Sequence, residues 1–207
     1  MNYVQPIREP EKIDAIEVIL MQHPRDYIIW LIGIYAGLRC GDILRLYVKD
    51  FRGRSHIEIR EQKTGELKRI KIHPKLKAAV NEYIKGKHDY EPIIKSREGK
   101  NQPLTTTRVY QIIKDAARKA GIKDAIGTHS MRKTFGYWLY DRYRRSNAKG
   151  PVFALAFLKQ WFGHSSEDVT ARYIGLTQDI FDKAIDGLKI GTYGNKKRIR
   201  DVEVMDE

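Results

Sequence analysis

The chain has 207 residues, 42% of them hydrophobic, which is enough for one well-packed domain. It carries 39 lysines and arginines against 26 aspartates and glutamates, a formal charge of +13 that favours a polyanionic partner such as nucleic acid over a merely soluble basic surface. The best candidate for a membrane span, residues 27–38, is shorter than the ~18 residues required; residues 1–12 lack a signal-peptide core, and the one cysteine, Cys40, fits a reducing cytoplasm.

The N-terminal part of the chain reads as helical. Residues 10–22 place apolar side chains at helical spacing with charges opposite them. Residues 25–36 are apolar nearly all round, which predicts a central buried helix that ends at Gly37. A short helix is expected from Asp42 through Leu46.

A different pattern follows. Residues 46–51, 56–60 and 67–73 alternate apolar and polar side chains, as half-buried strands do. Residues 52–54 and 63–66 provide the turns. We therefore predict a small three-stranded antiparallel β-sheet.

The rest of the chain returns to helical spacing, apart from a polar segment at 86–103 that reads as a loop. The expected helices are 74–85, 105–120, 129–145, 151–162 and 177–188. The predicted fold class is α+β, mainly α with one small sheet. Residues 1–190 are expected to form a single domain, followed by a charged C-terminal tail at 191–207.

Four stretches contain candidate functional side chains. GTHSMRKTFGYWLY (127–140) places His129 and Arg132 on one helix face, one turn apart. AGLRCGDILRL (36–46) places Arg39 just after the end of the buried helix. EQKTGELKR (61–69) places Lys63 at the tip of the predicted hairpin.

The fourth stretch, FGHSSEDVTARYIG (162–175), places His164 nine residues before Tyr173. Together the four stretches resemble the catalytic domain of the tyrosine recombinases, which include phage and transposon integrases, Xer-type resolvases and the short fimbrial invertases. The resemblance covers residues 8 to 188. It includes an alanine-glycine-leucine-arginine motif with an acidic residue three positions later, here Asp42, where the family usually has glutamate.

The resemblance implies a site composed of Arg39, Lys63, His129, Arg132, His164 and Tyr173. Two guanidiniums suit a clamp on the non-bridging oxygens of a phosphate. Tyr173 would attack the phosphorus and form a 3′-phosphotyrosine linkage, without ATP or metal. Lys63 would protonate the leaving 5′ oxygen, His129 would assist proton transfer, and His164 would hydrogen-bond a phosphate oxygen. Asp42 would orient Arg39 or the local helix without contacting the phosphate itself.

Each residue also has a simpler interpretation. Arg39 could be a cation at a helix end, and Lys63 an ordinary turn lysine, with Lys68 and Lys71 close by in the sequence. His129 and His164 could belong to helix caps. Tyr173 is one of 12 tyrosines and is distinguished only by its spacing from His164. The co-occurrence of these residue types in the family's order favours the functional interpretation.

The function implied is site-specific recombination of double-stranded DNA by a cytoplasmic, nucleoid-associated enzyme without metal or other cofactor. The resemblance further implies a tetramer on DNA, assembled through the helix at 177–188, and it allows accessory DNA-bending proteins. The family's N-terminal core-binding domain is not expected in this chain. Two alternatives remain: a DNA-binding regulator that does not cut, and a relaxase like the type IB topoisomerases.

Overall fold

The computed structural model describes residues 4–146, 149–177 and 185–188. The chain divides into two units, Met1–Gly175 and Leu176–Glu207, and every helix and strand described below belongs to the first. Residues 178–184 of the helix expected at 177–188, and the whole expected tail at 191–207, lie outside the described residues. None of the helices in the described ranges has the length and hydrophobicity that a membrane crossing requires.

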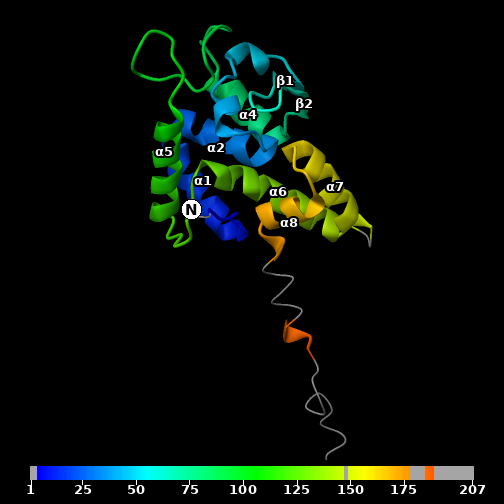
Figure 1. Ribbon diagram of the computed structural model, residues 1–207. Helices are drawn as coiled ribbons and strands as arrows, with labels where there is room; N and C mark the ends of the chain where they lie inside the picture. The colour runs from blue at the N-terminus through cyan, green and yellow to red at the C-terminus, as the bar shows by residue number, and fades with distance from the viewer. Residues whose placement is uncertain (1–3, 147–148, 178–184, 189–207) are drawn as a thin grey trace, which may run out of the picture. The chain divides into compact units, whose positions relative to one another are not determined.

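A central helix organises the first unit, as the sequence predicts. Helix α2 (Pro24–Ala36) buries residues on all its sides, with Ile28 to Ile32 at most 1% exposed. It packs against four other helices, shown around it in Figure 1: α1 (Pro10–Met21), α4 (Pro74–Tyr83), α5 (Thr106–Lys119) and α6 (Thr128–Arg144). Because α2 is apolar nearly all round, burial on every side is its most favourable environment.

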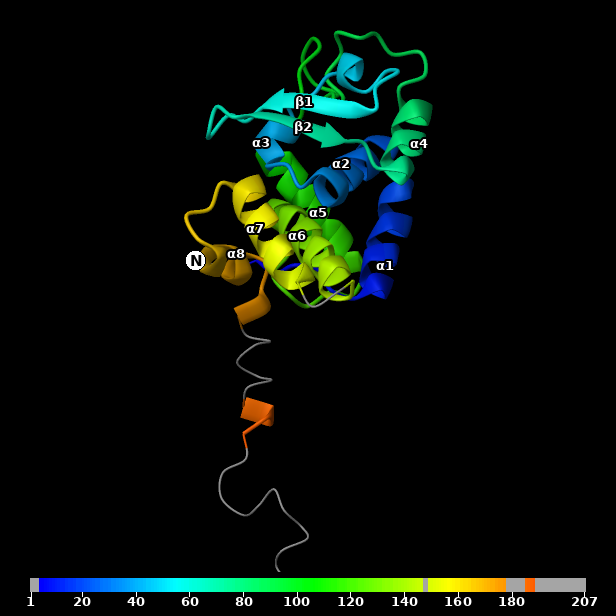
Figure 2. The same cartoon turned by 90° about the vertical axis from the view of Figure 1, so that its right-hand side faces the viewer.

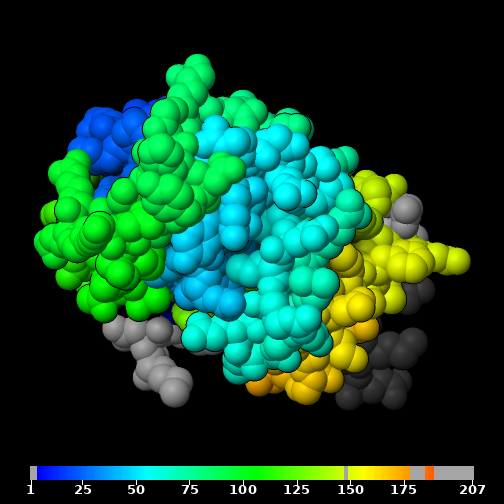
Figure 3. Space-filling view, turned by 90° about the horizontal axis from the view of Figure 1, so that it is seen from above, coloured from blue at the N-terminus to red at the C-terminus, as the bar shows by residue number. Residues whose placement is uncertain are grey.

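The small sheet contains two strands instead of the three expected. Strands β1 (His56–Arg60) and β2 (Leu67–Lys71) pair antiparallel, with Ile57 opposite Ile70. Figure 2 shows this hairpin across one end of the helical layer, above α2 and α3 (Cys40–Ile43). Seen from above in Figure 3, the hairpin, in cyan and teal, is flanked by the yellow and orange segments that contain α7 and α8.

The prediction of a strand at residues 46–51 is wrong. Tyr47 forms only an isolated bridge with Pro92, and the chain continues into a short 3₁₀ helix, Val48–Asp50. Two features stop the pairing: the Asp50 carboxylate accepts the Tyr47 N–H at 2.7 Å, and Pro92 has no N–H to extend a ladder. Leu46 and Val48 are nevertheless buried, which explains the strand-like alternation.

Two further helices complete the unit. Helix α7 (Gly150–Phe162) packs on α6 and ends at Gly163, which has a φ of 66°. Helix α8 (Glu167–Tyr173) follows, and the Ser166 hydroxyl caps it by accepting the Val169 N–H at 3.2 Å. The longer helices predicted in the first unit are thereby confirmed, with ends that differ by a few residues. The short helix expected from Asp42 through Leu46 instead runs from Cys40 to Ile43, with Asp42 inside it, and α8 was not predicted.

Glycines allow α2 and α6 to approach closely. A Cβ on Gly33 would lie 2.6 Å from the Met131 sulfur, and a Cβ on Gly37 would lie 2.3 Å from the Phe135 ring. Gly37 also ends α2 in the left-handed conformation, with a φ of 60°. The end of α2 is thus held against the middle of α6, which places Arg39 and Arg132 in the same region.

Candidate functional site

Arg39 projects from the junction between α2 and α3. Its side chain is 21% exposed. One guanidinium nitrogen, Nη2, donates to the Phe162 carbonyl at 3.1 Å, and the other, Nη1, lies 2.8 Å from Oε1 of Glu61. The guanidinium is therefore fixed by contacts from the hairpin and from the end of α7, while part of it remains accessible.

Arg132 lies on α6 and is 3% exposed. Its Nη1 donates to the Gly37 carbonyl at 2.5 Å, and its Nη2 donates to the Phe162 carbonyl at 3.4 Å. Its guanidinium carbon lies 4.5 Å from the centre of the Phe162 ring. Burial lowers the pKa of this guanidinium, but arginine stays charged at any physiological pH.

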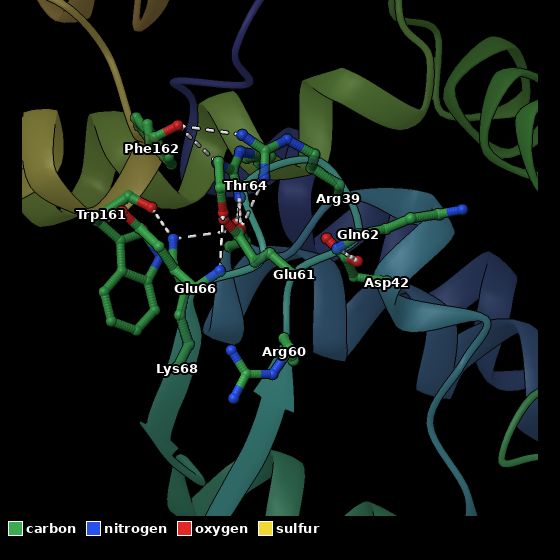
Figure 4. A network of polar contacts seen from close by, with 12 residues as sticks. Arg39, Asp42, Arg60, Glu61, Gln62, Thr64, Glu66, Lys68, Trp161 and Phe162 are labelled. Carbon is green, nitrogen blue, oxygen red and sulfur yellow. Dashed lines mark hydrogen bonds and ion pairs between the residues drawn. The ribbon is translucent and has the colours of Figure 1, made fainter.

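The two arginines share their acceptors. Both donate to the Phe162 carbonyl, and both approach Oε1 of Glu61, at 2.8 Å for Arg39 and 3.7 Å for Arg132. Figure 4 shows Arg39 pointing toward Glu61 and Phe162. Two guanidiniums that are far apart in sequence are thus held side by side, and we call this pair, Arg39 and Arg132, the arginine clamp.

His164 is oriented by Thr170 of α8. Its Nδ1 lies 3.1 Å from the Thr170 hydroxyl oxygen, and that hydroxyl donates to the Ser166 carbonyl at 3.0 Å. Because a threonine hydroxyl has one hydrogen, the His164 Nδ1 must be the donor. Its Nε2 is then an acceptor in the neutral ring and a donor in the imidazolium. Burial, followed by the charges of Arg132, Arg39 and Lys63, lowers the pKa of His164.

Tyr173 is the last residue of α8 and is half-buried. The centre of its ring lies 4.9 Å from the His164 ring and 5.2 Å from the Phe162 ring, both in edge-on arrangements. The Lys133 ammonium lies 5.1 Å from the same ring centre. Tyr173 is also close enough to Arg132 to oppose part of the lowering that burial causes in the pKa of that guanidinium. The expected nucleophile thus lies beside the arginine clamp.

His129 and Lys133 lie on α6 around Arg132. His129 is exposed on the first turn, and partial desolvation together with Arg132, Lys133 and Arg39 lowers its pKa. Lys133 is buried and donates to the Val4 carbonyl at 2.8 Å; burial lowers its pKa to about 8. His129 therefore faces solvent at the rim of the site, while Lys133 lies beneath it.

Lys63 and Lys68 differ sharply in their surroundings. Lys63 is exposed on the hairpin turn, close enough to His164 to lower its pKa. Lys68 is 7% exposed, lies 3.2 Å from Oε1 of Glu61, and donates to the Trp161 carbonyl. The structure therefore puts an exposed lysine near His164 and a buried lysine near Glu61.

Asp42 contacts the backbone of the hairpin. Its Oδ1 accepts the backbone N–H of Gln62 at 2.9 Å and lies 3.5 Å from Arg45. The side chain is 1% exposed. Since Gln62 follows Glu61, whose carboxylate contacts Arg39, Asp42 anchors the backbone from which that carboxylate projects.

Sequence reasoning missed Glu61 and left Lys68 as a neighbour of Lys63. Both residues occupy positions at which the alternation along the hairpin points inward. Buried Ile57 and Ile59 precede Glu61 at every second position, and buried Ile70 follows Lys68 two residues later. A charged side chain at a buried position requires an opposite charge or hydrogen bonds nearby. This break in the apolar alternation is the signal that could have identified the pair.

A cavity of about 790 Å³ lies elsewhere, where α2 and α5 begin. Its lining contains Arg25, Lys95 and Arg108, with Asp26 and Glu98 among them. None of the seven site residues predicted from the sequence lines it. The residues that the sequence predicts to be catalytic lie instead on or beside α3, the hairpin, α6, α7 and α8.

Known proteins share both sequence and fold with this chain. Residues 11–179 match the model of the phage integrase family. The probable integrase/recombinase YoeC of Bacillus subtilis is 37% identical over 180 residues, which are 86% of this chain and 93% of YoeC.

Solved recombinases have the same fold. A crystal structure of XerA recombinase superposes with a TM-score of 0.66 at 19% identity, over 90% of this chain and 65% of XerA. A lambda integrase tetramer bound to a Holliday junction gives 0.61 at 16% identity, over 82% of this chain and 48% of that integrase. This chain thus spans less than two thirds of either structure. It belongs to the phage integrase family, with the fold of a tyrosine recombinase catalytic domain.

Proposed function

We propose that this protein cuts and rejoins DNA strands through a 3′-phosphotyrosine intermediate. The single observation that carries the proposal is that Arg39 and Arg132 share two acceptors beside the Tyr173 and His164 rings. A phosphate placed against this pair would have guanidinium donors on its non-bridging oxygens and the tyrosine next to it. The relatives named as recombinases and the DNA-bound tetramer of lambda integrase support the same function.

The proposed reaction is a pair of transesterifications. The Tyr173 oxygen attacks the scissile phosphorus, the bond between phosphorus and the 5′ oxygen breaks, and the tyrosine proton passes to a nearby base. Arg39 and Arg132 stabilise the charge on the five-coordinate transition state. In the second step a 5′ hydroxyl attacks the phosphotyrosine and releases Tyr173, so the bond energy is kept and no nucleotide triphosphate is consumed.

Proton transfer is assigned to the remaining side chains. Lys63 protonates the leaving 5′ oxygen, a role supported by the exposure of the hairpin turn that carries it. His129 assists proton transfer at the exposed rim of the site. His164, oriented by Thr170, contacts a phosphate oxygen through Nε2, and Asp42 supports the hairpin.

The partner proposed is double-stranded DNA, bound by a tetramer that assembles through residues 177–188. The charge of +13 supports a DNA partner, and binding should weaken steeply with salt as counterions return to the phosphates. Deleting residues 177–207 should then impair tetramer formation on DNA. Unchanged assembly in native gels or by light scattering would eliminate this part of the proposal.

A covalent-trapping assay tests the proposal. The protein is incubated with nicked duplexes that tile the DNA beside its own coding region, quenched in detergent, and examined for a protease-sensitive DNA–protein adduct. Tyr173→Phe is run beside the wild type, with Tyr110→Phe, which changes an exposed tyrosine of α5, as the matched control.

We expect adducts with the wild type and the Tyr110 variant, and none with Tyr173→Phe. An adduct with Tyr173→Phe would move the nucleophile to another residue. Salt-sensitive binding without any adduct would instead favour the non-cutting regulator. Relaxation of any supercoiled plasmid by the monomer, without a specific site, would favour a type IB relaxase.

A further inference from the structure

Glu61 is a buried carboxylate at the centre of the arginine clamp. Its side chain is 0% exposed, and its Oε1 lies 2.8 Å from Arg39, 3.2 Å from Lys68 and 3.7 Å from Arg132. The other oxygen, Oε2, accepts a hydrogen bond from the Thr64 hydroxyl at 3.0 Å. One carboxylate oxygen therefore faces three cations contributed by different parts of the fold.

The charges around Glu61 are unbalanced. Three cations face the Glu61 carboxylate, and Asp42 adds a weaker attraction for Arg132. Like charges this close repel strongly in a buried site. Burial alone would raise the pKa of the Glu61 carboxyl, but the contacts from Arg39 and Lys68 outweigh it and hold that pKa below its ordinary value. Glu61 is thus ionised and offsets only part of the positive charge, which leaves the cluster able to accept a second anion.

The contact between Glu61 and Arg39 uses the buried side of the guanidinium. Oε1 of Glu61 lies 2.8 Å from Nη1 of Arg39, and both of these atoms are buried, although the Arg39 side chain as a whole is 21% exposed. Glu61 therefore holds Arg39 from the interior, and the exposed part of the guanidinium remains for an incoming phosphate.

Glu61 also closes the hairpin turn that carries Lys63. Its N–H donates to the Glu66 carbonyl at 2.9 Å, and its carbonyl accepts the Gly65 N–H at 2.9 Å. Glu61 is thereby joined to both sides of the turn by a short, hydrogen-bonded loop. The same residue contacts the phosphate clamp with its side chain and shapes the Lys63 turn with its backbone.

We propose that Glu61 is a positioning residue that holds Arg39, Arg132 and Lys68 together in the DNA-free protein and shares these cations with the scissile phosphate when DNA binds. This inference rests on the proposed function for the identity of the incoming anion. A carboxylate, although it repels phosphate, would thus keep the phosphate-binding cations in place before DNA binds.

The test compares Glu61→Gln with Glu66→Gln, which removes a charge from an exposed position on the same turn. Inorganic phosphate is titrated against each DNA-free protein, and thermal unfolding reports its binding. Removing a unit charge a few ångströms from the bound anion should tighten phosphate binding by roughly tenfold or more. Glu66→Gln should behave like the wild type. Equal phosphate affinity in wild type and Glu61→Gln would overturn the proposal.

A second readout separates positioning from a purely structural role. Single-turnover cleavage by Glu61→Gln should slow by about tenfold or more because the arginines lose their common anchor, while the Kd for DNA should not rise. Glu61→Asp, which keeps the charge, should restore part of the rate. Equal loss of rate and DNA affinity in both variants would contradict positioning.

The proposal remains testable if Glu61→Gln fails to fold. In the wild type, NMR titration of the Glu61 carboxyl carbon should show its pKa rising when inorganic phosphate is present, because two anions then compete for the same cations, Arg39, Lys68 and Arg132. A pKa unaffected by saturating phosphate would overturn the proposal. The phosphate experiments use no DNA, so a wild type that binds phosphate as expected but forms no adduct would defeat the proposed function and leave the Glu61 inference standing.

Discussion

The orientation of His164 gives the sharpest single-residue prediction. Thr170 is 0% exposed, and its hydroxyl accepts from the His164 Nδ1 at 3.1 Å while donating to the Ser166 carbonyl at 3.0 Å. Thr170→Val keeps the shape of the side chain and removes both hydrogen bonds. The Ser166 carbonyl keeps the Thr170 N–H at 3.2 Å and His164 is only half-buried, so the cost in stability should be that of ordinary lost hydrogen bonds, about 0.5–1.5 kcal/mol.

Thr170→Val should also slow cleavage, since the imidazole loses the contact that fixes its tautomer and direction. A loss of transition-state stabilisation of about 1.4 kcal/mol corresponds to a tenfold slower rate. The measurement is the rate of adduct formation in a single turnover, at a temperature where circular dichroism shows every variant folded.

Two controls separate chemistry from stability. Ser166→Ala removes the cap of α8, an acceptor for the Val169 N–H, and should cost about 1 kcal/mol of stability while leaving the bond between His164 and Thr170 in place. Thr170→Ser keeps the hydroxyl and should retain most of the rate. If Thr170→Val cleaves as fast as Ser166→Ala, or if Thr170→Ser is as slow as Thr170→Val, the orienting role is refuted.

Three further predictions follow from the geometry. Gly37→Ala should destabilise the fold by about 2–4 kcal/mol in urea unfolding, because it strains a positive φ and presses a methyl group on Phe135; a loss under about 0.5 kcal/mol would contradict the close packing. Lys63→Ala should slow cleavage and be rescued by a substrate with a sulfur in place of the 5′ oxygen, which needs no acid, whereas Lys68→Met should not be rescued; the reverse pattern would assign the acid to Lys68. Burial, Arg132 and Arg39 lower the pKa of His164 below 6.5, so below about pH 6.5 the unfolded chain binds more protons than the folded one. The free energy of unfolding should therefore fall as pH decreases below about 6.5. If a His164→Gln variant shows the same dependence of unfolding free energy on pH, this histidine is not responsible.

The sequence predicts the members of the arginine clamp because their motifs are local. Arg39 follows a glycine that ends a buried helix, and Arg132 lies one turn after His129, so each can be identified from its neighbours. What the sequence could not supply is their common acceptor. The Phe162 carbonyl joins them only because α7 packs on α6, a contact between residues far apart in the chain.

The third strand illustrates the limit of periodicity. Residues 46–51 bury Leu46 and Val48 and expose Tyr47, as a strand would, but strand pairing also needs a partner with free backbone groups. Here the opposing residue is Pro92, and Asp50 takes the Tyr47 N–H. The partner of a segment is a long-range property, so alternation alone overestimates the sheet.

Glu61 was overlooked for a chemical reason. A carboxylate next to a phosphate-binding arginine is unfavourable if each residue is considered alone, so the search for phosphate ligands passes over it. The alternation of buried and exposed residues through β1 places it inward nonetheless. Charged residues at inward positions near predicted cationic sites are therefore worth including among the candidates.

The central claim is that Tyr173 forms the covalent bond to DNA beside Arg39 and Arg132. The most direct measurement is mass spectrometry of the adduct after digestion with protease and nuclease. The account predicts a nucleotide 3′-phosphate on the peptide that contains Tyr173, and no adduct from Arg132→Ala despite retained DNA binding. A nucleotide attached to any other residue would contradict it.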